Sequence, residues 1–376
     1  MALVSTTGQT YEASAPGFRV TLGEQRVILP SRIYGWRNFP DQPLTFIAKK
    51  RHYRVFIVVP PATWLAEGPD MASLSPVVPH PVLGPGPPTD FDNGYAGIFG
   101  AYHDQASGQL LVFYHAEDHL GFPATKPGEI PAAYFSIGMA SSRDNGLTFT
   151  KHGPIITSPV PKRTDVSRTI QGVGEGSICT DPTGAYLYCY FSDKTFYTPE
   201  FMAASGWKGP SGNILLARSR ISDRGEPGSW TKLYQGAFSE PGLGGKHNPV
   251  IIGAWFGEAH ATYPNVYRIP EWGCYVMVFS IVNSTDPSVE GFYVASSADG
   301  IMWSEPSRLL GGLRSHPMPG EPLAWWGTLD LESITEQRAT GWLYYAYSPA
   351  WSQAGFERLG RSPHFLCARP ITFSRV

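Results

Sequence analysis

The sequence predicts an all-β protein and, within that class, a five-bladed β-propeller. The chain repeats one pair of strands four times: an apolar, aromatic strand and, after a turn, a strand that ends in small residues. The units recur roughly every 70 to 90 residues, which is too long for a solenoid repeat and suits an elaborated propeller blade. Many short strands also need many turns, and the 376 residues include 41 Gly and 35 Pro.

The repeat sets the expected order of the blades. The aromatic strands are residues 110–115 (LLVFYH), 186–191 (YLYCYF), 275–280 (YVMVFS) and 343–348 (LYYAYS). The strands that follow them are residues 136–142, 213–219, 292–297 and 364–369. We therefore expect blades at 19–61, 95–157, 172–238, 260–310 and from 326 to the end.

The first blade is expected to take its strands from RVTLGEQRVIL (19–29) and HYRVFIVV (52–59), and the N-terminal strand to close the ring against the last blade. Residues 62–88 are rich in Pro and Gly, so we expect an irregular surface segment there. Six blades would result if the first 90 residues held two small units. No linker divides the chain, so residues 1–376 are expected to form a single domain.

Composition excludes several classes of partner. A hydrophobic content of 42% suffices for a large core, while a net charge of −2, with 16% charged residues, gives no basic surface for nucleic acid or an anionic membrane. Residues 1–10 lack the basic and apolar regions of a signal peptide. We expect a cytoplasmic protein, or a secreted or periplasmic one if a leader has been removed, acting as a monomer or a small homo-oligomer.

The four cysteines indicate little about redox state. Cys179 and Cys189 flank the turn TDPTGA and could face each other on paired strands, although buried unpaired thiols are the favoured interpretation. Their spacing, with Cys274 and Cys367, matches no zinc pattern.

Two turns carry the Asp-box pattern S-x-D-x-G-x-T-W/F. One spans Ser142 to Phe149 and the other, a shortened version, spans Ser297 to Trp303. The Asp can bind the turn backbone, Gly supplies a positive φ, and the aromatic ring packs beneath, so the boxes are expected to be structural. They resemble those of sialidase-like and other glycan-processing propellers. VYRIP (266–270) also resembles the Arg-Ile-Pro motif of sialidases, although no further Arg residues stand at matching strand starts, which leaves a sialidase as a minor alternative.

Carboxylates recur where one rim of the propeller is expected. The start of an innermost strand and the end of the next strand lie at the same end of a blade, because the two are antiparallel neighbours. Acid/base chemistry at a glycosidic bond needs a protonated carboxyl group and an ionised one. The expected catalytic residues are Glu175, Asp92 and Asp330, and the expected substrate-binding residues are Glu117, Asp118, His119, Arg168, Asp193, His260, Tyr263, Asn265, Trp326 and Glu332.

Glu175 is the strongest candidate, because Gly174 and Gly176 would let a ligand approach closely and an unpaired Glu beside an apolar strand is costly. The competing interpretation is an ion pair with Arg168. Asp92 precedes a plain turn signature, Asn93-Gly94.

The other candidates also have structural alternatives. Asp330 and Glu332 share one strand face and could form a structural ion pair. His119 and His260 could be ordinary structural histidines. Tryptophans in expected loops could stack on sugar faces; they are Trp36, Trp207, Trp255, Trp325, Trp326 and Trp351.

This arrangement resembles the five-bladed glycoside hydrolases of family 43 and related furanoside-active enzymes. The resemblance implies that a Glu opening the third blade is the general acid, which Glu175 matches, and that Asp residues opening the first two blades are the base and a modulator. Asp92 could match the second blade; for the first, Asp41 in FPDQP is only a loop candidate. No cofactor is expected, and no ligand motif supports a central Ca²⁺.

We therefore predict a glycoside hydrolase that acts on an oligo- or polysaccharide, for example a furanoside such as an arabinan. Glu175 is expected to be the general acid, and Asp92 or Asp330 the base or nucleophile. The alternatives are a polysaccharide lyase that uses Tyr263 and His260, and a propeller that binds a glycan without cleaving it.

Overall fold

The computed structural model of the protein describes most of the chain. The described residues are 11–15, 17–36, 39–49, 52–123, 132–165, 170–195, 197, 203, 212–253, 259–282, 284, 286–311, 323–348 and 364–376. Arg168, Trp207, Trp255 and Trp351 lie outside them. The helices that lie wholly within these ranges are short 3-10 turns: η1 (Ile33–Gly35), η2 (Met71–Ser73), η3 (Ile221–Asp223), η5 (Pro270–Trp272) and η6 (Pro287–Val289). No helix within these ranges is long and apolar enough to span a membrane.

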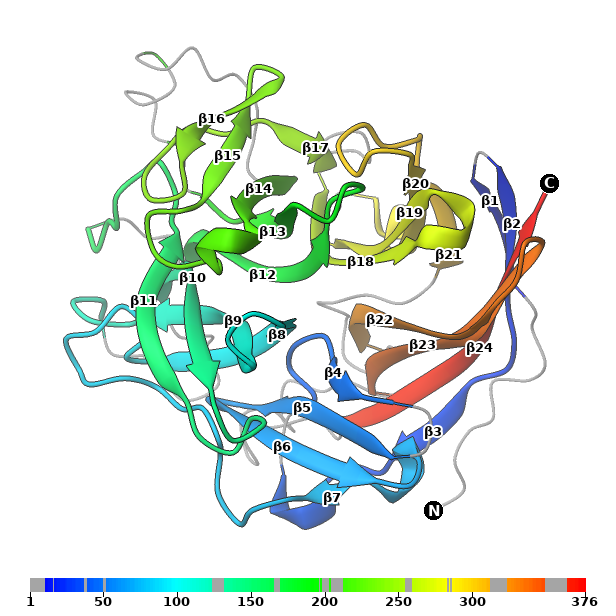
Figure 1. Ribbon diagram of the computed structural model, residues 1–376, viewed down its shortest axis with the longest axis horizontal. Helices are drawn as coiled ribbons and strands as arrows, with labels where there is room; N and C mark the ends of the chain where they lie inside the picture. Colours follow the sequence, from blue (N-terminus) through cyan, green and yellow to red (C-terminus); the bar gives the residue numbers. More distant parts are fainter. Residues whose placement is uncertain are drawn as a thin grey trace.

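The described strands form five antiparallel units that surround a common axis (Figure 1). The first unit contains β4 (Thr45–Ala48), β5 (Tyr53–Val59), β6 (Ala62–Gly68) and β7 (Ser75–Pro76). The second contains β8 (Tyr95–Asp104), β9 (Gln109–Asp118), β10 (Ala133–Ser142) and β11 (Thr150–Ile156). The third contains β12 (Ile170–Thr180), β13 (Tyr186–Asp193), β14 (Ile214–Arg220), β15 (Thr231–Tyr234), β16 (Ala237–Pro241) and β17 (Pro249–Ile251).

The last two units complete the ring. The fourth contains β18 (His260–Ile269), β19 (Cys274–Val282), β20 (Gly291–Ser297) and β21 (Ser307–Gly311). The fifth contains β22 (Leu323–Ile334), β23 (Arg338–Ser348) and β24 (Phe365–Arg375), joined by β1 (Tyr11–Ala15), β2 (Phe18–Leu22) and β3 (Arg26–Leu29). A three-residue parallel contact between β10 and β12 links the second and third units.

The predicted all-β propeller is confirmed, and the repeat places its second and fourth units correctly. The prediction for the first blade is wrong. Residues 18–22 and 26–29 pair with β24 in the fifth unit, and the innermost strand of the first unit is β4, which the prediction missed. Residues 62–68 form strand β6, although we expected irregular structure. Its sequence ATWLAEG contains no Pro, so the Pro-rich composition of 69–88 was extended too far toward the N-terminus.

The core lies between neighbouring sheets, so the middle strands are buried on both faces. In β9, eight consecutive residues are buried. Phe113 of that strand meets Trp230 of the third unit edge to face, with ring centres 5.7 Å apart. Trp36 and Trp326, expected in exposed loops, belong to the core between the first and fifth units, and Trp326 is fully buried. The high aromatic content therefore fills the wedges between blades.

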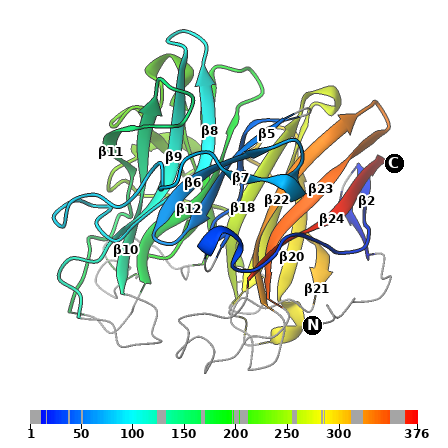
Figure 2. The same cartoon turned by 90° about the horizontal axis from the view of Figure 1, so that it is seen from below.

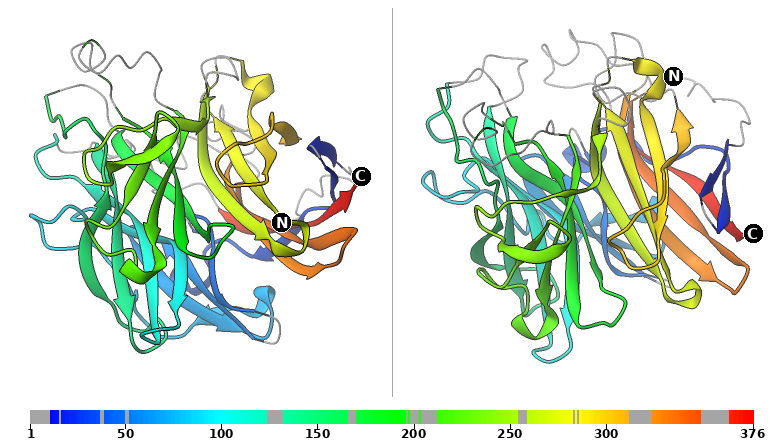
Figure 3. Two further views of the ribbon diagram at one scale, coloured as in Figure 1. Left: turned by 45° about the horizontal axis from the view of Figure 1, so that its top comes forward. Right: turned by 90° about the horizontal axis from the view of Figure 1, so that it is seen from above.

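The beginning and end of the chain close the ring together. β2 pairs over its full length with residues 371–375 of β24, and β3 pairs with residues 366–368 of the same strand. Figure 3 shows the N-terminal strands beside the C-terminal strand, and the Val376 N–H donates to the Gly17 carbonyl at 3.2 Å. The predicted closure of the ring by an N-terminal strand is confirmed.

The packing at this closure predicts a large stability effect. Phe373 is fully buried and meets Phe18 edge to face with ring centres 5.5 Å apart. The substitution Phe373→Ala is expected to lower the free energy of unfolding by about 3 to 5 kcal/mol, because it leaves a cavity. Urea unfolding measures the change, with Met302→Ala as a control at a side chain that is 75% exposed. A loss below about 1 kcal/mol would show that the closure packs loosely.

The two Asp boxes have the structural role that their sequence indicates. The Asp144 carboxylate accepts backbone N–H groups of Leu147 and Thr148 at 3.1 and 2.9 Å, and Asp299 accepts those of Ile301 and Met302 at 2.8 Å. Gly146 and Gly300 have φ values of +89° and +75°. The terminal aromatics pack inward, Phe149 against Phe56 and Trp303 against Tyr190.

Cys179 and Cys189 do not face each other. In the β12–β13 ladder, Cys189 is opposite Ile178, and Cys179 is opposite Tyr188. This offset of one residue places the two side chains on opposite faces of the pleated sheet. All four cysteines carry free thiols.

Candidate active site

The innermost strands of the five units start at the same end of the axis, which we call the strand-start end. Neighbouring inner strands run in the same direction. The Thr262 hydroxyl of β18 donates to Glu175 of β12, and further along both strands the Val266 N–H donates to the Ser177 hydroxyl. The side-chain oxygen of Asn265 in β18 accepts a hydrogen bond from the Leu329 N–H of β22 at 2.8 Å. Strands β12 and β18 run side by side in Figure 2. A bulge interrupts each of β4, β8, β12, β18 and β22. Bulges re-aim side chains, so they can turn polar residues toward the axis.

Glu175 lies in the bulge of β12. Its φ of +51° is uncommon for a residue other than Gly. Gly174 and Gly176 flank it because a Cβ at either position would collide with the ring of His115 or of Phe99. The backbone on both sides of Glu175 is therefore tightly packed, and the residue is only 5% exposed.

Two groups hold the Glu175 carboxylate. The Thr262 hydroxyl donates to Oε2 at 2.5 Å, and the Lys194 ammonium lies 3.4 Å from the same oxygen. Burial alone would raise the pKa of Glu175, but Lys194, together with the hydrogen bonds, holds it below its ordinary value. Glu175 is therefore ionised at neutral pH.

Asp41 lies just before β4 and faces the same space. The Tyr95 hydroxyl donates to its Oδ2 at 2.7 Å. The indole N–H of Trp326 donates to the carbonyl of the preceding residue, Pro40, at 3.1 Å. Burial raises the pKa of Asp41 to about 6; the Tyr95 bond opposes this shift, and the charges of Glu117 and Glu175 add to it. Three carboxyl groups are thus within electrostatic reach of one another.

Glu117 accepts from two histidines at the end of β9. Nε2 of His119 lies 2.8 Å from Oε2, and Nε2 of His115 lies 3.2 Å from Oε1. Burial raises the pKa of Glu117, but these hydrogen bonds outweigh burial and lower it to about 2. The Glu117 charge is therefore permanent and favours a protonated Asp41.

Tyr263 completes the group from the bulge of β18. It has a φ of +53°, and its N–H donates to the Ser192 hydroxyl at 3.0 Å. The Lys194 ammonium lies 5.7 Å from the centre of its ring. Burial, followed by the charges of Glu175 and Asp41, raises the pKa of Tyr263 well above its ordinary value, so the phenol stays neutral.

The arrangement separates two carboxyl groups by protonation state. Asp41 keeps its proton up to about pH 6, while Glu175 is already ionised. Neighbouring groups whose pKa values are driven apart can act as the acid and the base of one reaction.

The shift at Asp41 predicts a pH-dependent stability. Its pKa rises from 3.8 to about 6 on folding, so the native state binds a proton that the unfolded state releases across this window, and stability falls as pH rises through it. Asp41→Asn is expected to raise the free energy of unfolding by about 1 to 3 kcal/mol at pH 7 and to change it little at pH 4. Urea unfolding at both pH values measures the change. An equal effect at both would contradict the raised pKa.

The structure brings together Glu175, Glu117, His119 and Tyr263 of the expected residues, and it adds Asp41. It does not bring Asp92 or Asp330 to them. Asp92 is fully buried. Its Oδ2 forms an ion pair with the Lys151 ammonium and accepts a hydrogen bond from the Tyr114 hydroxyl. Asp330 forms the structural ion pair that the sequence left open, with Lys49 at 2.6 Å, toward the far end of the inner strands.

The remaining expected residues have other surroundings. Glu332 is exposed and accepts a hydrogen bond from the Tyr53 hydroxyl at the far end. The Asp118 carboxylate accepts from the Asn93 amide and pairs with the Lys162 ammonium. The buried Asp193 carboxylate accepts from the Thr195 N–H and the Tyr197 hydroxyl. Asn265 ties β18 to β22, and His260 starts β18 opposite Val282. Trp326 is buried, so its ring cannot stack on a sugar. Arg268 of the sialidase-like motif, at the far end of β18, donates to the Pro182 carbonyl.

Of this group, the sequence analysis named Asp41 only as a loop candidate for the first blade, and it did not include His115 or Lys194 among the expected site residues. Asp41 would have been a stronger candidate had TFIA (45–48) been recognised as the innermost strand, because Asp41 then precedes a strand start. His115 is the last residue of the aromatic stretch 110–115, where it was counted as part of the strand, and Lys194 follows the expected residue Asp193 directly.

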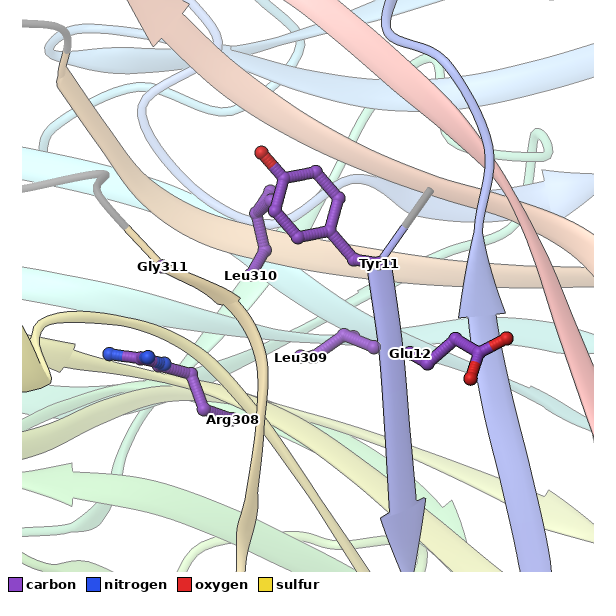
Figure 4. Close-up of a pocket in the computed structure, with 6 residues that line it drawn as sticks. All are labelled: Tyr11, Glu12, Arg308, Leu309, Leu310 and Gly311. Atoms are coloured by element: carbon purple, nitrogen blue, oxygen red, sulfur yellow. The ribbon is translucent and has the colours of Figure 1, made fainter. Parts of the chain in front are cut away.

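Two further geometric features lie apart from this group. A cavity of about 370 Å³ lies between the edge strands β1 and β21, lined by Tyr11, Glu12, Arg308, Leu309, Leu310 and Gly311 (Figure 4). It contains none of the expected site residues. Within the described ranges, no three His, Cys, Asp or Glu side chains are arranged to hold a metal ion.

No family model and no curated protein matches this sequence. Solved structures are similar in three dimensions, among them the α-L-arabinofuranosidase from Lactobacillus brevis, at 12% identity over 88% of this chain and 90% of that chain, with a TM-score of 0.54. The catalytic domain of the Coprinopsis cinerea GH62 α-L-arabinofuranosidase is 11% identical over 95% and 98%, with a TM-score of 0.52. The chain shares the β-propeller fold of these proteins. An N-acetylgalactosamine deacetylase from F. plautii also shares this propeller fold, at 11% identity over 96% and 95%, with a TM-score of 0.50.

Proposed function

We propose that this protein is a glycoside hydrolase that cleaves an oligo- or polysaccharide. The observation that carries the proposal is that Asp41, which keeps its proton up to about pH 6, and Glu175, which is already ionised, lie together at the strand-start end of the axis. The likeness of the fold to enzymes named α-L-arabinofuranosidases supports a furanoside, such as an arabinan, as the first substrate class to test.

In this proposal, Asp41 gives its proton to the leaving glycosidic oxygen. Glu175 acts as the base that activates water, or as the nucleophile, depending on the separation of the two carboxyl groups in the complex. Burial, with the charge of Glu117 adding to it, keeps Asp41 protonated up to about pH 6. These roles reverse the one that the family resemblance implies for Glu175, because Lys194 favours the ionised form of its carboxyl group. Two carboxyl groups suffice for this reaction, so the proposal includes no cofactor.

The neutral phenol of Tyr263 disfavours a lyase in which Tyr263 is the base. A lyase would need a tyrosinate or another strong base to abstract the proton next to a uronate carboxyl group. The raised pKa of Tyr263, which burial and the nearby carboxylates cause, leaves almost no tyrosinate at neutral pH to act as that base. As a neutral donor, it can bind a sugar hydroxyl instead.

The test is a panel of plant, algal and bacterial polysaccharides, beginning with arabinans. The expected result is the release of reducing ends without an ultraviolet-absorbing product. An absorbing, unsaturated uronate product would replace the hydrolase with a lyase. Binding to a glycan without any product, measured by calorimetry, would replace it with a glycan-binding propeller.

A further inference from the structure

His115 connects two of the carboxylate residues at the strand-start end. It is the last residue of the aromatic stretch LLVFYH in β9 and is 1% exposed. Its Nε2 lies 3.2 Å from Oε1 of Glu117, and its Nδ1 lies 3.3 Å from the backbone nitrogen of Glu175. One imidazole ring therefore contacts residues of two neighbouring blades.

The partners determine where the proton of this ring lies. The backbone N–H of Glu175 can only donate, so Nδ1 must accept and cannot carry a proton. The Glu117 carboxylate, with its pKa lowered by the hydrogen bonds of both histidines, can only accept, so Nε2 must carry the proton. The ring is therefore the neutral Nε2–H tautomer.

The hydrogen bond to Glu175 replaces one that the sheet does not supply. Gly174 pairs with Ser192 and Gly176 pairs with Phe191, so the bulge leaves Glu175 without a partner in this ladder. A buried N–H without an acceptor costs free energy, and here the acceptor is Nδ1 of His115. The ring has little freedom to turn away, because Phe135 and Tyr95 meet it edge to face with ring centres 4.3 and 5.3 Å away.

We propose that His115 is a positioning residue that holds Glu175 in its strained bulge as a neutral Nδ1 acceptor, anchored in turn by Glu117. This inference rests on the proposed function, in which the Glu175 carboxylate performs the reaction. His115 contacts no reacting atom in this scheme. Its imidazole orients the backbone from which the Glu175 side chain projects.

Two substitutions separate the two ring nitrogens. His115→Asn places an amide oxygen near the position of Nδ1, where it can accept from Glu175, whereas His115→Gln reaches toward Glu117 and leaves the N–H without its acceptor. We expect His115→Gln to lower kcat by about 10- to 100-fold with KM nearly unchanged, because an unsatisfied buried donor would shift the bulge. His115→Asn is expected to retain most of the wild-type kcat.

Both variants are compared at equal folded fraction, with the urea midpoint measured for each. A His115→Gln enzyme with wild-type kcat would overturn the proposal. An equal loss of kcat in both variants would also overturn it, because the contact at Nδ1 would then not decide the outcome.

A spectroscopic measurement separates this inference from the proposed function. In protein labelled with ¹⁵N-histidine, the His115 signals are assigned by their absence from the His115→Gln spectrum. We expect an unprotonated Nδ1 and a protonated Nε2 at pH 7. The opposite tautomer or an imidazolium would overturn the inference, whatever the activity. The expected tautomer in a protein that cleaves no glycan would leave the geometry intact and remove only the hydrolase.

Discussion

Replacing Glu175 by Gln is expected to lower kcat by about 10²- to 10⁴-fold, the usual range for losing a group that transfers a proton. Gln has nearly the same volume and can still accept from the Thr262 hydroxyl, so the packing around the bulge is retained. It cannot act as a base or a nucleophile. Initial rates on the most active polysaccharide of the panel measure the loss, and azide is expected to restore part of the rate with an activated glycoside.

Glu332→Gln is the matched control for this substitution. It makes the same chemical change at an exposed side chain near the far end of β22. The Glu332 carboxylate accepts a hydrogen bond from the Tyr53 hydroxyl. We expect wild-type kinetics from the control. Comparable rates for Glu175→Gln and wild type would remove Glu175 from the reaction and leave the proposal without its base.

Asp41→Asn is expected to lower kcat by a similar factor of about 10² to 10⁴, but only on substrates with a poor leaving group. Asn cannot donate a proton to the glycosidic oxygen, and a natural sugar leaving group needs that proton. An aryl glycoside with an acidic phenol leaves without it, so the variant should keep most of the wild-type rate on such a substrate. Glu175→Gln should be slow on both kinds of substrate.

This contrast tests the assignment of the two roles. Asp223→Asn, at an exposed side chain in η3, serves as the control and should match wild type on both substrates. If the aryl glycoside rescues Glu175→Gln and not Asp41→Asn, Glu175 is the acid, as the resemblance to family 43 implies. If it rescues neither, Asp41 does not act as the proton donor.

The fold was largely predictable from sequence because the repeat is written in the middle strands. Strands β9, β13, β19 and β23 are buried on both faces and must be apolar and aromatic in every blade, so they stand out. The first blade was misassigned because its innermost strand, β4, has only four residues and no alternating pattern. The two strands at 18–29 have a clear β pattern, but pattern alone does not show that their partner lies more than 300 residues later in the chain.

The site was less predictable, for reasons that particular residues make plain. Glu175 could be recognised because two glycines mark its bulge. Asp92 and Asp330 have the same local features of a carboxylate near a strand, yet Lys151 and Lys49, distant in sequence, neutralise them. Asp41 lies in a loop whose position depends on Trp326 in the last blade. Such partners follow from tertiary packing, which one sequence does not show.

The pairing of β2 and β3 with β24 also bears on how the protein is made. A ribosome delivers the first of these strands long before residues 365–375 emerge, so the nascent chain holds an open ring until β24 has been synthesised. During that time, the edges that β24 will cover are available to other chains, a setting in which incomplete β-sheets aggregate. We therefore expect premature termination within residues 365–375 to yield insoluble protein, and chaperones that shield strand edges to raise the soluble yield of the whole chain.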